Sequence, residues 1–268
     1  MGVPYAEVIG DPIAHSESPT IHKFWLRKLG IDGDYSAVRV SPQEFPDYLD
    51  RRRRVDDWRG CYVTMPLKEI AFRAIDSDPV TKRIGSLNTI IHFGDGGVLG
   101  ANTDWIAFNL ALDTYRLRPK RPAVIGTGGT ARAAMAELHG CGVRAVDIIS
   151  RSKARAAKLL EEFEMSGEFF LLGSVPDADL LINASPLGMH GFPALELDIG
   201  NLPTGATVVD MVYNPLETPL LKAARERGLR TIDGLSMLMH QASMAFTYFF
   251  KDSPANLDAA ELRQLLTR

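Results

Sequence analysis

The sequence predicts an α/β protein of two domains. In the first part of the chain, apolar segments typical of buried strands alternate with helix-like segments, which is the pattern of a mostly parallel sheet covered by helices. A glycine-rich turn then joins an apolar run to an alanine-rich helix near the middle of the chain. The chain has 268 residues, more than one typical domain needs. We therefore expect an N-terminal, mostly parallel α/β domain and a second domain built around the glycine turn.

The N-terminal domain should end near residue 104. Gly30 closes its first helix, and the segment 94–97 (Gly-Asp-Gly-Gly) is a strong hairpin signal. The predicted strands are 5–9, 35–40, 60–65, 87–93 and 98–101, and the predicted helices are 19–29, 42–54 and 68–75.

The glycine turn has the pattern Gly-x-Gly-Gly-x-Ala over residues 126–131, between an apolar strand and a helix that runs to Gly140. Gly126 would make the tight turn, Gly128 would let a pyrophosphate approach the backbone, and Ala131 would allow close packing of helix on strand. A second strand at 145–149 completes the strand, helix, strand spacing. The pattern predicts a Rossmann-type domain that binds a dinucleotide at the helix N-terminus.

The residues after the second strand select the cofactor. A site for NAD usually places a carboxylate there, whereas arginine accommodates a 2′-phosphate. Residues 150–155 include cations and no carboxylate, so we predict NADP. The alternative is a glycine turn without a nucleotide, followed by a solvated helix start. The predicted cofactor residues are Gly126, Thr127, Gly128, Gly129, Thr130, Ala131, Ser150, Arg151, Ser152 and Arg155.

Composition excludes several classes of partner. The net charge is −3, from 30 basic and 33 acidic residues, so nothing favours nucleic acid or an anionic membrane. The arginine run 51–54 is flanked by aspartates and is typical of a solvated face. Cys61 and Cys141 are too few for a disulfide framework, and the six histidines lack metal-site spacing. With no signal peptide and no apolar run of membrane length, we expect a cytoplasmic protein without a metal.

Polar clusters stand where predicted strands of the first domain end, which is where an open α/β sheet binds its ligand. Ser16 and Ser18 lie in the loop before the first helix; capping of that helix explains Ser18, which precedes a proline, and leaves Ser16 unexplained. The other clusters are Thr64 to Lys68, Asn88-Thr89 and Asn102-Thr103-Asp104.

Together these motifs resemble those of the shikimate dehydrogenase family, in order over nearly the full chain. The matching residues are Ser16-x-Ser18-Pro19, Val63-Thr64-x-Pro66-x-Lys68, Asn88-Thr89, Asn102-Thr103-Asp104, the loop 126–131, Asn183-Ala184-Ser185-Pro186-x-Gly188-Met189, Tyr213-Asn214-Pro215-x-x-Thr218-Pro219-Leu220 and the segment from Asp233-Gly234-Leu235 to Gln241. The resemblance implies NADP-dependent, reversible reduction of 3-dehydroshikimate to shikimate in aromatic amino acid biosynthesis, with a small-molecule substrate and a monomeric or homodimeric enzyme.

The resemblance also implies roles for individual residues. It makes Lys68 and Asp104 the catalytic pair, and it places Gly234 and Met237 near the nicotinamide. Substrate-binding roles fall on Ser16, Ser18, Thr64, Asn88, Tyr213 and Gln241, with Tyr213 near the substrate carboxylate. The implied domains are a substrate domain of residues 1–104 and 238–268 and an NADP domain of residues 105–237, the chain returning after about residue 237 as a helix that completes the first domain.

The chemistry of the reaction needs such a pair. Hydride transfer to a ketone leaves an alkoxide that must receive a proton, so an acid must lie within hydrogen-bond reach. Lys68 can supply it, or can instead mainly position the substrate, and Asp104 can hold both the lysine and a substrate hydroxyl. The plainer alternative is that Lys68 and Asp104 form a structural ion pair.

Two residues depart from the family pattern. Tyr62 stands where asparagine is expected, and Trp105 follows Asp104 where glycine is usual. Tyr62 faces either the core or the substrate, because strand register decides its side. These departures leave open a paralogue that acts on quinate or another hydroxylated cyclic acid. A non-catalytic NADP-binding regulator is a further alternative, against which the presence of both Lys68 and Asp104 argues.

Overall fold

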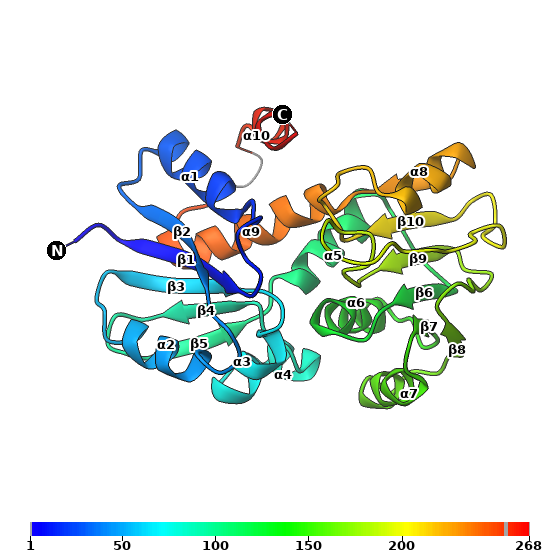
Figure 1. Ribbon diagram of the computed structural model, residues 1–268, viewed down its shortest axis with the longest axis horizontal. Coiled ribbons are helices and arrows are strands. Elements are labelled where there is room, and N and C mark those ends of the chain that lie inside the picture. Colours follow the sequence, from blue (N-terminus) through cyan, green and yellow to red (C-terminus); the bar gives the residue numbers. More distant parts are fainter. Residues whose placement is uncertain (1, 255–256, 268) are drawn as a thin grey trace. The chain divides into compact units, whose positions relative to one another are not determined.

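The computed structural model describes residues 2–254 and 257–267. The chain divides into two compact units (Figure 1). Unit 1 consists of Met1–Thr103 and Met239–Arg268, and unit 2 consists of Asp104–Leu238.

Unit 1 is built on a five-stranded sheet with the order β2-β1-β3-β4-β5. Its strands are β1 (Tyr5–Gly10), β2 (Asp34–Arg39), β3 (Trp58–Val63), β4 (Thr89–His92) and β5 (Val98–Ala101). β1 pairs in parallel with β2 and β3, whereas β4 is antiparallel to β3 and to β5. The predicted mostly parallel sheet is confirmed, and the 94–97 segment makes the hairpin between β4 and β5.

Helices cover both faces of this sheet. They are α1 (Ser18–Leu29), α2 (Phe45–Arg52), α3 (Lys68–Ala74), α4 (Pro79–Ile84), α9 (Gly234–Phe250) and α10 (Ala259–Leu266). Because side chains alternate along a strand, Cys61 and Val63 pack in the cluster that holds α2 and α3 residues, while Tyr62 between them packs with Ala245 and Phe249 of α9. The predicted return of a C-terminal helix to the first domain is confirmed, although α9 is continuous from Gly234.

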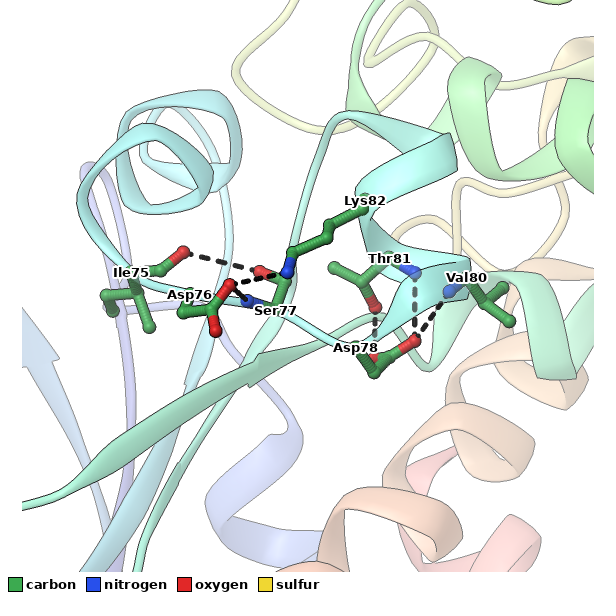
Figure 2. A network of polar contacts seen from close by, with 7 residues as sticks. All are labelled: Ile75, Asp76, Ser77, Asp78, Val80, Thr81 and Lys82. Carbon is green, nitrogen blue, oxygen red and sulfur yellow. Dashed lines mark hydrogen bonds and ion pairs between the residues drawn. The ribbon is translucent and has the colours of Figure 1, made fainter.

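Two helices of unit 1 differ from the sequence prediction. α2 is shorter than the predicted 42–54, because Phe45 is its first residue and Arg52 its last. α4 was not predicted, although its signals are local: the Asp78 carboxylate accepts hydrogen bonds from the backbone N–H groups of Val80 and Thr81, both at 2.9 Å (Figure 2). Gly85 closes α4 in the left-handed conformation and leads into the segment that carries Asn88.

Unit 2 contains a six-stranded sheet with the order β11-β10-β9-β6-β7-β8, and every neighbouring pair is parallel. The strands are β6 (Pro122–Ile125), β7 (Asp147–Ser150), β8 (Phe169–Leu171), β9 (Leu180–Asn183), β10 (Thr207–Asp210) and β11 (Arg230–Ile232). The helices that precede or connect them are α5 (Asp104–Thr114), α6 (Gly129–Gly140), α7 (Lys153–Glu162) and α8 (Pro219–Glu226).

The strand order of unit 2 is that of the dinucleotide-binding fold. Counted from β8, the strands follow the chain as third, second, first, fourth, fifth and sixth. The order reverses between β6 and β9, and ligands of such sheets bind beyond the carboxyl ends of the strands at that reversal. The predicted Rossmann-type domain is confirmed, and the glycine turn leaves β6 at the reversal itself.

Among the described residues, no helix is both long and apolar enough to cross a membrane. Within the same ranges, no group of three or more histidine, cysteine, aspartate or glutamate residues is placed to hold a metal ion.

Candidate active site

Polar side chains of unit 1 gather at one edge of its sheet, which we call the polar edge. Since β1, β3 and β5 run in one direction and β4 runs in the other, the carboxyl ends of the first three lie beside the start of β4. Backbone hydrogen bonds hold this edge together: Thr64 N–H donates to the Ile9 carbonyl at 2.9 Å, and Asn88 N–H donates to the Ala101 carbonyl at 3.1 Å. The predicted site residues on the polar edge are Ser16, Ser18, Thr64, Lys68 and Asn88.

The two serines after β1 do not behave as the capping alternative predicted. Ser18 is the first helical residue of α1, Glu17 occupies the N-cap position, and no side chain caps the helix. Instead, Ser16 Oγ accepts a hydrogen bond from Ser18 N–H at 3.3 Å. The capping explanation of Ser18 is therefore wrong, because its hydroxyl does not cap the N-terminus of the helix.

Thr64 and Lys68 belong to one turn that leads from β3 into α3. Leu67 N–H donates to the Thr64 carbonyl at 2.9 Å, and Lys68 opens the helix. Lys68 is only 9% exposed, which is rare for a lysine that has no role in an ion pair or a site. Its carbonyl accepts from Leu87 N–H at 3.2 Å, which ties the lysine to the segment before β4.

Asn88 is the hub of the polar edge and is fully buried. Its Oδ1 accepts from Thr103 N–H at 2.7 Å and from the Thr89 hydroxyl at 3.0 Å. Its Nδ2 donates to Thr103 Oγ1 at 3.1 Å and, over a longer 3.4 Å, to the Tyr62 hydroxyl. Thr103 was noted in the sequence only as part of a motif, yet it fixes the orientation of this amide.

Tyr62 packs in the core, and its hydroxyl joins the polar side chains of the edge. Its ring lies in the apolar cluster with Val8, Ala245 and Phe249. Its hydroxyl donates to Gln241 Oε1 at 2.9 Å, across 179 positions of sequence. The tyrosine is therefore core packing at its ring and part of the polar edge at its oxygen.

Residues 102–105 follow β5 in the sequence and lead from unit 1 into unit 2. Asn102 Nδ2 donates to the Ser86 carbonyl at 2.8 Å, and so joins the end of β5 to the segment before β4. Asp104 is the first residue of α5 and is fully buried. Trp105, the second departure from the family pattern, is only partly buried.

The glycine turn of unit 2 fits a pyrophosphate. Gly126 has a φ of 107°, and an added Cβ would lie 3.1 Å from the Ala184 carbonyl oxygen, so only glycine suits the position. An added Cβ on Gly128 would meet nothing within 4 Å. α6 begins at Gly129 without a side-chain cap, so backbone N–H groups of its first turn face the open side of Gly128. The chemistry of a phosphate group matches these donors.

The basic segment after β7 lies close to the glycine turn, since β6 and β7 are paired neighbours. Arg155 Nη2 contacts the Thr127 carbonyl at 3.5 Å. Ser152 Oγ caps α7 by accepting from Arg155 N–H at 3.3 Å, and Ser150 bonds to Ser152. The two serines thus build the local turn, while Arg151 is exposed and no carboxylate occupies the strand end.

The remaining predicted residues of unit 2 follow β10 and β11 in the sequence. Gly234 opens α9, and an added Cβ would lie 2.4 Å from the Val212 carbonyl oxygen, so the helix start passes too close to the end of β10 for a side chain. Met237 is fully buried, and Tyr213, just beyond β10, is partly buried.

Asp210 is a residue of this region that the sequence interpretation missed. It ends β10 in full burial, and burial raises the pKa of its carboxyl group. Its oxygens accept from the Thr218 hydroxyl at 2.6 Å, Asn183 Nδ2 at 2.9 Å and Val212 N–H at 3.0 Å. The signal was a lone acid at the end of an apolar strand, and its role is to connect the ends of β9 and β10.

Known proteins resemble this chain over its full length. A family model described as the shikimate dehydrogenase substrate binding domain matches residues 8–90. A shikimate dehydrogenase (NADP(+)) of Sphingopyxis alaskensis is 46% identical over 266 residues, which are 98% of this chain and 97% of that protein. The chain belongs to the shikimate dehydrogenase family.

Solved structures of the family and of a neighbouring enzyme have the same fold. A shikimate 5-dehydrogenase of Thermus thermophilus in complex with NADP(H) and shikimate superposes with a TM-score of 0.86, at 34% identity and with 98% of each chain covered. A quinate dehydrogenase of Corynebacterium glutamicum in complex with NAD also gives a TM-score of 0.86, at 26% identity and with 98% of each chain covered. Shikimate dehydrogenases and a quinate dehydrogenase therefore share this fold.

Proposed function

We propose that this protein is an NADP-dependent shikimate dehydrogenase, which reversibly reduces 3-dehydroshikimate to shikimate in aromatic amino acid biosynthesis. The observation that carries the proposal is the full-length identity of 46% to a shikimate dehydrogenase (NADP(+)). The residues support it as well, because unit 1 presents hydroxyl, amide and ammonium groups at one sheet edge and unit 2 presents a glycine turn suited to phosphates.

The polar edge of unit 1 binds the substrate in this proposal. On this edge, Ser16 and Ser18 donate hydrogen bonds to the substrate carboxylate, while Thr64 and Gln241 bind ring hydroxyls. Tyr213 of unit 2 also donates to the carboxylate in this proposal. Asn88, whose amide is engaged with Thr103 and Thr89, holds the edge in shape as well as contributing to the substrate site. A site of hydrogen-bonding side chains rejects analogues that lack a hydroxyl, because a buried polar group then loses its partner.

Lys68 and Asp104 perform the proton chemistry in this proposal. When NADPH is bound it supplies the hydride that reduces the substrate ketone. Lys68, buried to nine-tenths, donates a proton to the oxygen of that ketone as the alkoxide forms. Asp104 accepts a hydrogen bond from a substrate hydroxyl and so fixes the ring for the transfer.

Unit 2 selects NADP through the ends of β6 and β7. The pyrophosphate is bound by N–H groups at the start of α6, beside Gly128. The 2′-phosphate is bound by Arg151 and Arg155 at the start of α7. Gly234 and Met237, at the start of α9, lie near the nicotinamide in this proposal. The domain boundaries follow the same division of labour, with 1–104 and 238–268 for the substrate and 105–237 for the cofactor.

The test is absorbance at the reduced-nicotinamide band, with purified protein and shikimate or quinate crossed with NADP or NAD. Rapid reduction of NADP by shikimate alone is the expected result. Turnover of quinate alone, or of shikimate only with NAD, would contradict it.

A second candidate within the same chemistry is oxidation of quinate or another hydroxylated cyclic acid. Two observations favour it: the phenol of Tyr62 reaches Gln241 at a position where the family pattern has asparagine, and a quinate dehydrogenase shares the fold. The substrate panel above separates the two candidates. A protein that bound NADP and turned over no cyclic acid would instead be a regulator.

A further inference from the structure

A series of hydrogen bonds in unit 1 determines the orientation of the side-chain amides of Asn88 and Gln241. The series begins at the backbone N–H of Thr103, which can only donate a hydrogen bond. Asn88 Oδ1 accepts from it at 2.7 Å, so the oxygen of this amide is committed to that side. The NH₂ group of Asn88 then faces the Tyr62 hydroxyl. Thr103 Oγ1 lies within hydrogen-bond distance of both ends of the amide, at 3.1 Å from Nδ2 and 3.3 Å from Oδ1.

The Tyr62 hydroxyl links the orientation of the Asn88 amide to that of the Gln241 amide. A tyrosine hydroxyl has one proton to donate and can accept at its oxygen. Because its oxygen faces the Asn88 NH₂ group at 3.4 Å, its proton goes to Gln241 Oε1 at 2.9 Å. One acceptor site of the Gln241 oxygen is thereby used, and the donor that Gln241 can offer a substrate is its NH₂ group.

Gln241 is only 7% exposed, and its Oε1 is the atom that accepts the Tyr62 hydrogen bond. The proposed function assigns Gln241 to substrate binding. The series of hydrogen bonds from Thr103 indicates that its NH₂ group, rather than its oxygen, is directed to the substrate.

We propose that Tyr62 is a positioning and specificity-determining residue, which holds Gln241 so that its NH₂ group donates to a substrate oxygen. This inference deepens the proposed function and rests on it. The substrate oxygen at Gln241 is therefore bound as a hydrogen-bond acceptor. A neutral amide at position 62 in place of tyrosine can itself donate or accept, so it imposes no such direction. Tyr62, a departure from the family pattern, thus adds selectivity to this chain.

The ring of Tyr62 supports its hydroxyl. It is 7% exposed and packs among Val8, Ala245 and Phe249, so it has little rotational freedom. A side chain held in this way keeps its hydrogen bond without an added entropy cost when the substrate binds. Rigid placement is what a specificity residue needs.

The experiment compares wild-type protein with Tyr62→Phe, using NADP at saturation and, as substrates, shikimate or the two single-deoxy analogues that keep the hydroxyl to be oxidised. Tyr62→Phe keeps the ring and removes only the hydroxyl. We expect KM for shikimate to rise about three- to tenfold with little change in kcat, in line with the loss of one hydrogen bond. The wild type should discriminate most strongly against one deoxy analogue, and that discrimination should largely vanish in Tyr62→Phe.

Tyr35→Phe is the matched control. Tyr35 packs in the same apolar cluster, but its buried hydroxyl has no hydrogen-bond partner within the described ranges. This variant should keep the KM for shikimate and the same order of preference among the analogues. A rise in KM equal to that of Tyr62→Phe would attribute the effect to core packing and overturn the proposal.

Gln241→Glu tests the direction of the amide and serves if Tyr62→Phe does not fold. The glutamate can still accept from Tyr62 but carries no NH₂ group, so KM for shikimate should rise while the KM for NADP stays constant. An unchanged KM for shikimate would overturn the proposal. Wild-type protein that fails to oxidise shikimate would overturn the proposed function itself, whereas wild-type turnover with equal selectivity in Tyr62→Phe would overturn only the role of Tyr62.

Discussion

The two units present different parts of the polypeptide to a ligand. Unit 1 offers side chains from several segments, and its key contacts join residues far apart in sequence, such as Tyr62 and Gln241. Unit 2 offers mainly backbone, since Gly126 and Gly128 remove side chains from the turn and α6 begins without a side-chain cap. A substrate with hydroxyl groups needs directional side chains, whereas a pyrophosphate is bound by N–H groups that every residue has.

This contrast predicts how each unit responds to substitution. In unit 1, loss of one side chain should change catalysis or substrate choice and spare the cofactor. In unit 2, addition of one methyl group should change cofactor affinity and spare the substrate. The variants below test that separation, from the largest expected effect to the smallest.

Lys68→Ala should cause the largest loss. Removal of the proton donor should lower kcat by about 10²- to 10⁴-fold, the usual contribution of a general acid. NADP binding, measured by calorimetry, should stay within about twofold because unit 2 is unchanged. The control is Lys82→Ala, which removes an exposed lysine of α4 that pairs with Asp76 and should leave kcat unaltered. Near wild-type turnover in Lys68→Ala would refute the catalytic assignment.

His22→Phe should change the stability of unit 1 in acid. His22 is fully buried and stacks on Tyr35 with ring centroids 3.9 Å apart, and burial lowers its pKa from 6.5 to about 3. The unfolded chain therefore takes up a proton that the folded chain does not, so the free energy of unfolding falls as pH drops from about 6.5 toward 3. By pH 5 the loss is about 2 kcal/mol, and His22→Phe should remove it.

The measurement for His22 is denaturant unfolding at pH 7 and pH 5, followed by tryptophan fluorescence. Trp25 and Trp58 are buried in unit 1 and report on it. His190→Gln, at an exposed position of unit 2, is the control and should keep the wild-type pH dependence. A variant at position 22 that lost stability in acid as steeply as the wild type would exclude this histidine as the cause.

Gly126→Ala and Gly128→Ala should separate backbone strain from phosphate binding. At Gly126, a φ of 107° and a carbonyl oxygen 3.1 Å from the added Cβ should cost about 1–3 kcal/mol of stability as well as NADP affinity. At Gly128 the added Cβ meets no protein atom within 4 Å, so stability should hold while the KM for NADP rises about tenfold. Melting temperature and cofactor kinetics measure the two effects. An unchanged KM for NADP in Gly128→Ala would place the phosphates elsewhere.

Arg151→Ala should have the smallest effect and should act on the choice of cofactor. Loss of one cation near the 2′-phosphate should reduce the ratio of kcat/KM for NADP over NAD by about tenfold, and the KM for shikimate should not change. The control is Lys158→Ala, which removes a charge from an exposed position of α7, the helix that follows Arg151, where Lys158 pairs with Glu162. Equal ratios in the two variants would mean that net charge, rather than contact, sets the preference.

Much of the fold was predictable because its signals are local. The glycine turn, the strands that flank it and the hairpin before β5 each depend on a few adjacent residues. α4 was missed although Asp78, Pro79 and Gly85 mark its ends, because its six residues are too short to show a helical period. Ser18 was wrongly predicted to cap α1, because a serine before a proline gives the same sequence pattern whether or not its hydroxyl accepts a hydrogen bond from the first turn of the helix.

The candidate site was less accessible to such reasoning. The motifs placed Thr64, Lys68 and Asn88 on one sheet edge, but the bond between Tyr62 and Gln241 depends on which face of β3 meets α9, and alternation alone leaves that choice open. Asp210 has the same difficulty, because its partners Asn183 and Thr218 lie on separate segments. Contacts between distant segments follow from the assembled sheet, and no local pattern contains them.

The division of the chain into units has a consequence for how the protein is made. Unit 2 is one continuous segment, Asp104–Leu238, whereas unit 1 needs Met239–Arg268 in addition to its first 103 residues. A ribosome therefore completes the second unit before the first. Until the last part of α9 emerges, the face of the unit 1 sheet that carries Val8, Tyr35 and Tyr62 lacks its cover from Ala245 and Phe249. Gln241 lies in the same helix as Ala245 and Phe249. The part of α9 that belongs to unit 1 therefore both covers the apolar face of the sheet and adds Gln241 to the proposed substrate site.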